Sequence, residues 1–178
     1  YVIDCGDLGL TISNCRIVGT LVLVNSSSAT VLRDAIAWEA AAPGMPSVLV
    51  DGSIRIEVDD DDLSEPDLLT NFNPSGVPFQ GTSDTDLLDQ YPSLLRGLFY
   101  VSERLWFSGN GTLTRFDGVT VCDSTSAGAS VEFNYSSVPF DSPPPGFSSG
   151  PQMSIIPGTW RRARYRRGSS SSHAIRIL

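Results

Sequence analysis

The chain has 178 residues, of which 40% are hydrophobic and 18% are charged. This composition is typical of a folded domain with a single core, and it excludes an intrinsically disordered chain. The net charge of −8 argues against a nucleic-acid surface, because contacts to phosphates need a positive field. No apolar run reaches the roughly 18–20 residues of a membrane-spanning helix.

Short apolar bursts, separated by glycine and asparagine, make up residues 1–24. Such bursts predict strands with tight turns, too closely spaced for helices to intervene. A glycine also precedes a β-rich stretch at 19–25, 52–58 and 128–135, which read GTLVLVN, GSIRIEV and GASVEFNY. We interpret these glycines as corners, where the backbone needs a positive φ or a close approach.

Residues 26–46 interrupt this pattern and leave two interpretations open. Thr30 can cap a short helix that places Trp38 inward, but residues 30–38 also fit strand–turn–strand. The Asp-Gly pair that follows at 51–52 lies between two β-rich runs, which predicts a hairpin or a tight turn.

A long acidic insertion occupies residues 59–93, for which we expect at most one turn of helix, near 84–88. Loops of this length in compact domains are typically functional or mobile. The insertion opens with four carboxylates that we expect to take part in subunit contacts: Asp59, Asp60, Asp61 and Asp62. Further on, Asp84, Asp86 and Asp89 place oxygens at i, i+2 and i+5, a set that suits a loop site for Ca²⁺. The alternative is a solvated acidic loop.

Short strands return from Leu94 onward, again separated by brief corners. In a β-solenoid each coil contributes a few inward apolar residues that stack on the next coil, so this pattern predicts an all-β, right-handed parallel β-helix. A β-sandwich is the alternative fold. Three consecutive prolines at 143–145 cannot continue a sheet, so the solenoid should end near Ser136. We expect a β-helix domain at 1–147, including the 59–93 insertion, and an extended arm at 148–178.

The distribution of charge separates that arm from the rest of the chain. Residues 1–160 contain six arginines and all 20 acidic residues, for a net charge of −14 (6 − 20), whereas residues 161–178 contain six arginines and no acid. The arm concentrates its cationic and aromatic side chains in one segment: Trp160, Arg161, Arg162, Arg164, Arg166 and Arg167. We expect this segment to dock on the acidic body of its own or a neighbouring subunit. Binding of phosphate, RNA or an anionic headgroup is the alternative.

Three segments read LTISNCRIVGTLVLVN, PSVLVDGSIRI and YPSLLRGLFYVSERLWFSG, and PPPGF and GTW follow them. In this combination the chain resembles the β-helix domains of bacterial pilin-like, pilus-assembly-associated surface proteins, planctomycete proteins among them. The resemblance implies a structural scaffold at the cell surface, outside the cell or in the periplasm, with copies of itself or other pilus-like subunits as partners. A hydrophobic helix usually precedes the β-helix in that group, and this sequence lacks it.

Catalytic signatures are weak throughout the chain. The single histidine is His173, in the arm, and no nucleophile or nucleotide motif occurs, so we expect no enzyme and no cofactor beyond Ca²⁺. The alternative function is a carbohydrate-binding or polysaccharide-cleaving β-helix protein, for which Trp106 is the candidate sugar platform if it faces outward. Cys5 and Cys15 form one disulfide if the compartment is oxidising, or else remain buried thiols.

Overall fold

The computed structural model describes residues 1–6, 8–109 and 113–143. The chain divides into one compact unit, Tyr1–Ser148, and a second, Ser149–Leu178, which lies outside the described residues. Within the described residues, no helix is long and apolar enough to cross a bilayer.

The first unit is a β-solenoid of about six turns. Its strands are β1 (Val2–Asp4), β2 (Thr11–Val18), β3 (Leu21–Ser26), β4 (Val31–Glu39), β5 (Pro46–Gly52), β6 (Ile54–Val58), β9 (Leu94–Phe107), β10 (Leu113–Ala127) and β11 (Ser130–Tyr135). Every pairing among these strands is parallel, which confirms the predicted parallel β-helix and excludes the sandwich.

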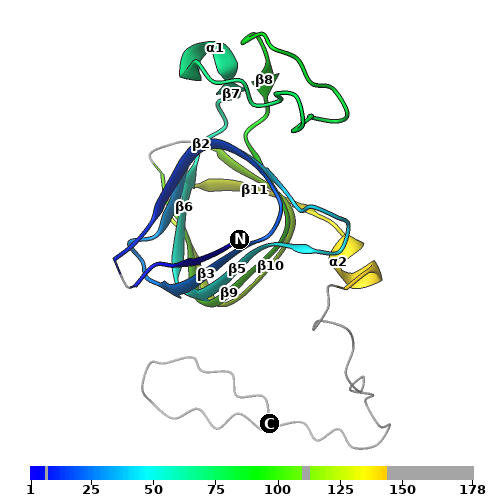
Figure 1. Ribbon diagram of the computed structural model, residues 1–178. Helices are drawn as coiled ribbons and strands as arrows, with labels where there is room; N and C mark the ends of the chain where they lie inside the picture. Colours follow the sequence, from blue (N-terminus) through cyan, green and yellow to red (C-terminus); the bar gives the residue numbers. More distant parts are fainter. Residues whose placement is uncertain (7, 110–112, 144–178) are drawn as a thin grey trace, which may run out of the picture. The chain divides into compact units, whose positions relative to one another are not determined.

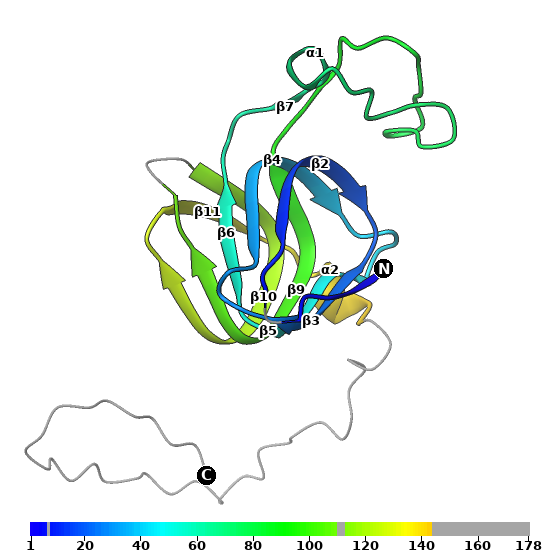
Figure 2. The same cartoon turned by 60° about the vertical axis from the view of Figure 1, so that its left-hand side comes forward.

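Seen along its axis, the solenoid has three faces (Figure 1). Face A stacks β1, β3 and β5 on the middle parts of β9 and β10. Face B stacks the first halves of β2 and β4 on β6 and then on the ends of β9 and β10. Face C stacks the second halves of β2 and β4 on the starts of β9 and β10, and β11 completes it. The two ends of the solenoid lie on opposite sides of the body, with β1 and β2 at one end and β11 at the other (Figure 2).

Inward side chains form one row on each face. Row A contains Ile3, Leu23, Val50, Val101 and Cys122. Row B contains Ile12, Leu32, Ile56, Phe107 and Ala127. Row C contains Ile17, Trp38, Leu95, Phe116 and Phe133. The three middle members of each row are at most 2% exposed, so the core runs along the axis and opens at both ends.

The register of the strands locates the insertion. Val2 pairs with Val22, twenty residues on, but Ile54 pairs with Leu105, fifty-one residues on. The extra chain leaves the solenoid after β6 and returns at β9. The predicted insertion at 59–93 therefore occupies one corner of one coil without breaking the stack.

Two local predictions need correction. Residues 31–39 form strand β4 with a bend at Asp34 (φ 59°), so the helical interpretation of this segment is wrong. Gly52 makes a tight corner (φ 114°), but β5 and β6 do not pair with each other, so the hairpin is wrong. In a solenoid, the backbone of each coil forms its hydrogen bonds with the coils above and below. An Asp-Gly pair can therefore form a corner between two strands that do not pair, just as it can form the turn of a hairpin.

Short elements organise the insertion and the end of the solenoid. In the insertion, β7 (Leu63–Ser64) pairs antiparallel with β8 (Gln90–Tyr91), and α1 (Glu65–Leu68) follows β7. The helical turn is thus not at 84–88, because Ser64 caps α1 and a proline lies in its first turn. The solenoid ends as predicted, at Tyr135, and α2 (Val138–Asp141) follows.

Candidate interaction surfaces

A buried carboxylate holds the insertion together. Glu65 is fully buried, and its side chain accepts hydrogen bonds from the backbone N–H groups of Phe72 (2.6 Å) and Asp89 (3.3 Å) and from the Tyr91 hydroxyl (3.4 Å). Tyr91 also donates to Asp89 at 3.0 Å. Burial, the hydrogen bond to Asp89 and the charge of Glu65 raise the pKa of Tyr91 well above its usual value. The insertion is therefore an ordered unit, and its apolar cluster around Leu63 and Tyr91 also packs on Ala35 of β4.

Arg16, on face C, fastens this unit to the solenoid. Its guanidinium donates to the backbone carbonyls of Phe72 (2.6 Å) and Pro78 (2.9 Å) and lies over the rings of Phe79 and Tyr91. Within the described residues, Arg16 forms no ion pair with a carboxylate. Arg16 thus contacts the insertion through neutral acceptors and aromatic rings, which leave its positive charge unbalanced.

Replacing Arg16 by methionine is expected to release the insertion while the solenoid stays folded. The variant loses two charge-assisted hydrogen bonds, so docking weakens by about 2 kcal/mol and backbone amides of 65–91 exchange roughly 30-fold faster. Hydrogen-exchange mass spectrometry measures this directly. Arg33→Met is the matched control, because the one ion pair of Arg33 in the described part of the chain is with its neighbour Asp34 at 3.3 Å. Equal exchange in the two variants would show that Arg16 does not hold the insertion.

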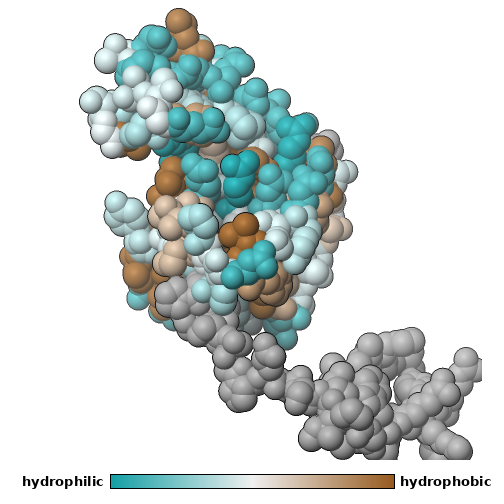
Figure 3. Space-filling model, turned by 90° about the vertical axis from the view of Figure 1, so that its right-hand side faces the viewer, coloured by the Kyte–Doolittle hydropathy of each residue, from teal (hydrophilic) through white to brown (hydrophobic). Residues whose placement is uncertain are grey.

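The first coil leaves an apolar recess at the N-terminal end of the solenoid. The recess measures about 670 Å³ and is lined by the starts of the inward rows and by the insertion: Val2, Ile3, Ile12, Ile17, Leu21, Phe72 and Val77 are among its apolar residues. In Figure 3 the insertion overhangs this side of the body, and the surface is hollowed beneath it. Val2 is 72% exposed and Val77 is 54% exposed, so the recess is open to solvent.

The last coil leaves aromatic side chains uncovered at the opposite end. Phe133 is 53% exposed, although one side of its ring packs on Phe107 and Phe116 at centroid distances of 5.4 Å. Tyr135 is 72% exposed. The chain then turns back along the corner, since the Ser142 carbonyl lies against Gly44, and the Phe140 ring stacks on Tyr135 at a centroid distance of 6.2 Å. Within the described residues, no strand pairs with the outer edge of β11.

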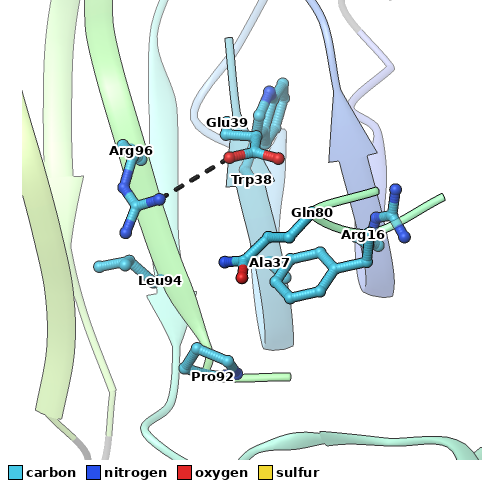
Figure 4. Close-up of a pocket in the computed structure, with 9 residues that line it drawn as sticks. Arg16, Ala37, Trp38, Glu39, Gln80, Pro92, Leu94 and Arg96 are labelled. Atoms are coloured by element: carbon cyan, nitrogen blue, oxygen red, sulfur yellow. Dashed lines mark ion pairs between the residues drawn. The ribbon is translucent and has the colours of Figure 1, made fainter. Parts of the chain in front are cut away.

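A third surface runs over the outside of face C, around Arg96. Arg96 lies 3.7 Å from Glu39 on the neighbouring strand β4 (Figure 4). It also lies 3.8 Å from Asp117 on β10, the strand on its other side. Three recesses of about 60, 440 and 530 Å³ meet at Arg96. Gln80 from the insertion borders the smallest recess, and Tyr135 borders the largest. The groove brings two carboxylates, one guanidinium and polar groups together on an exposed sheet.

The carboxylates that were predicted to bind Ca²⁺ are only partly brought together. Asp84 and Asp89 both accept from the amide of Asn73, at 3.2 and 2.8 Å, whereas Asp86 accepts from the backbone N–H of Leu88. Among the described residues, no group of three or more His, Cys, Asp or Glu side chains is placed to hold a metal ion. The calcium site stays a prediction, and its geometry would require Asn73 to move.

The structure describes the acidic run at 59–62 but not the arginine arm. Asp60, Asp61 and Asp62 are exposed beside the solenoid, and Asp60 lies 3.9 Å from Arg115. Asp59 is half-buried, and one of its carboxylate oxygens is buried without a hydrogen-bond partner among the residues that the structure describes. The arm residues Trp160, Arg161, Arg162, Arg164, Arg166 and Arg167 lie outside the described residues.

Replacing Asp59 by asparagine is expected to stabilise the protein at neutral pH. Burial first, and then the charges of Asp61, Asp34 and Asp60, raise the pKa of Asp59. The folded state therefore disfavours the charged carboxylate, and the neutral amide removes this penalty. The gain is present above the folded pKa and disappears as pH falls below the unfolded value of about 3.9. Thermal unfolding of Asp59→Asn and wild type at pH 7 and pH 3 tests this, and an equal gain at both pH values would contradict it.

All three cysteines are free thiols in the structure, so it does not contain the Cys5–Cys15 disulfide. Cys5 is buried in the core, and burial raises the pKa of Cys15 to about 11. The alternative of buried thiols describes this arrangement. Trp106 faces outward at 37% exposure while Phe107 is buried, as the strand alternation predicts.

Sequence reasoning missed the two residues that organise the insertion. A single arginine in a strand carries no signal of its partner, so nothing marks Arg16. Glu65 had a weak signal, because it follows the capping residue Ser64 at the start of a helical turn.

Comparison with known proteins does not assign the chain to a family. No family model, no curated protein and no solved structure matches it.

Proposed function

We propose that this chain is a non-catalytic structural module of a bacterial cell-surface or extracellular appendage, pilus-like or filament-forming, and that it assembles through the ends of its solenoid. The observation that supports this is the open core. Each inward row begins or ends at a solvent-accessible side chain, such as Ile3 at 36% exposure and Phe133 at 53%. An open coil also presents unpaired backbone groups, which favour pairing with another strand.

The molar mass of the full chain, measured by light scattering over a range of concentrations, tests the proposal. We expect mass to rise with concentration. Mass that stays at the monomer value of 19.1 kDa at every concentration would refute assembly.

The same measurement at low and high salt, with and without residues 161–178, separates two sources of association. Contact between apolar ends is insensitive to salt, whereas an arginine arm docked on Asp59–Asp62 weakens as ions screen it. Loss of mass in the truncated chain would identify the arm as the source of association.

The groove around Arg96 favours a second candidate function, binding or cleavage of a glycan. Its support is the convergence of Glu39, Arg96 and Asp117 on the outside of a parallel β-helix. Paired carboxylates serve acid–base chemistry on sugars, and arginine binds acidic ones. A glycan array probed with wild type and Arg96→Ala tests this candidate: binding that the substitution abolishes supports it, and an array without signal removes it.

A further inference from the structure

We propose that the partner is a second copy of this chain and that the contact is head-to-tail: the β11 end of one copy, with Phe133 and Tyr135, seats on the recess at the β1–β2 end of the next. This inference rests on the proposed assembly function and specifies its geometry. The alternatives are contacts between like ends, which close as two-fold dimers.

The inward rows supply the first argument. Row C ends at Phe133 in one copy and begins at Ile17 in the next, and row B ends at Ala127 and begins at Ile12. Head-to-tail stacking continues each apolar row in register. It also continues the parallel pairing that every coil of the solenoid already uses. A contact between like ends would reverse the direction of the strands at the junction.

Charge supplies the second argument. Arg16 precedes Ile17 on β2, and Glu132 precedes Phe133 on β11, so the two charges lie at equivalent positions on the outer side of face C. Among the described residues, Arg16 has only neutral acceptors within hydrogen-bond distance, and the Glu132 side chain is 49% exposed and lies 3.8 Å from Arg115. Head-to-tail stacking brings Glu132 toward Arg16, so the two opposite charges favour this arrangement.

Shape supplies the third argument. The β1–β2 end is concave, with a recess of about 670 Å³ whose far wall is built by Phe72 and Val77 of the insertion. The β11 end presents the half-exposed ring of Phe133 and the largely exposed ring of Tyr135. Aromatic side chains are large apolar anchors that bind in such pockets. The insertion therefore borders the recess on one side and leaves it open to the β11 end of the partner.

Two variants that each block one end distinguish the geometries. Val2→Asp places a carboxylate in the recess, and Tyr135→Asp places one on the opposite end; both positions are 72% exposed, so both variants should fold, which circular dichroism checks. Val77→Asp is a second recess variant, at 54% exposure. Leu88→Asp, at 76% exposure and outside the recess, is the matched control.

Head-to-tail assembly predicts that each blocked variant alone is a monomer in light scattering and that an equimolar mixture forms a dimer containing one chain of each. The control should assemble like wild type. A variant that still dimerises alone through its intact end would overturn the head-to-tail inference and leave the assembly function standing. Wild-type-like assembly of all variants would also overturn it, by placing the contact elsewhere. A monomeric wild type would refute the assembly function itself.

Discussion

Replacing Phe99 by alanine is expected to lower the free energy of unfolding by about 3–5 kcal/mol, the cost of removing a large aromatic side chain from a packed core. Phe99 is 1% exposed, and its ring contacts Trp38 and Phe116 at centroid distances of 5.8 and 5.0 Å. These rings come from different coils, so the cavity would lie where several coils meet. Denaturation by urea, followed by circular dichroism, measures the loss.

Phe140→Ala is the matched control, because it removes the same side chain from a position that is 64% exposed. We expect it to change the free energy of unfolding by less than about 0.5 kcal/mol. Similar losses in the two variants would mean that the aromatic contacts between coils do not stabilise the solenoid.

Replacing Gly52 by alanine is expected to cost more than the strain of its backbone alone. The residue has φ 114°, and a Cβ would overlap the carbonyl oxygen of Ser26 in the coil below. Ser26 pairs with Gly52 in the sheet, so it cannot move away without breaking the ladder between β3 and β5. We expect a loss of about 3 kcal/mol or more, of which backbone strain accounts for about 1–2 kcal/mol.

Gly76→Ala isolates the strain. Gly76 also has a positive φ, 91°, but a Cβ there meets nothing within 4 Å. Its expected cost is about 1–2 kcal/mol, and it falls on the insertion. Thermal and urea unfolding of both variants measure the difference, and a Gly52→Ala protein as stable as Gly76→Ala would show that the corner tolerates a side chain.

Gly52 also shows how much of the fold the sequence predicts. Glycine followed by a β-rich run marks corners because a coil repeats the same physical requirement at each turn, and β3, β6 and β11 each begin two residues after such a glycine. The local pattern does not predict which strand lies next to each segment in the sheet. Asp51-Gly52 fits a hairpin and a coil corner equally well, and residues 31–39 fit a helix until the coils on either side supply hydrogen bonds to β4.

The candidate surfaces were less predictable than the fold. The acidic run of the insertion is visible in the sequence because its residues are consecutive. The recess is assembled from residues as distant as Val2 and Val77, and the Arg96 groove from three strands and the insertion. Such sites depend on register, which is set by the packing of whole coils and not by any single segment.

The insertion also has a consequence for how fast the protein folds. Between β6 and β9 the chain must close a gap of fifty-one residues instead of the twenty that separate paired residues of β1 and β3, which adds about 0.8 kcal/mol of loop-closure entropy. If the hydrogen bonds of Glu65 to Phe72, Asp89 and Tyr91 form first, β7 pairs with β8 and Leu63 lies beside Tyr91. Most of the extra chain between β6 and β9 is then already closed into a loop. The buried carboxylate would then set the order of events: the insertion collapses before the two halves of the solenoid join.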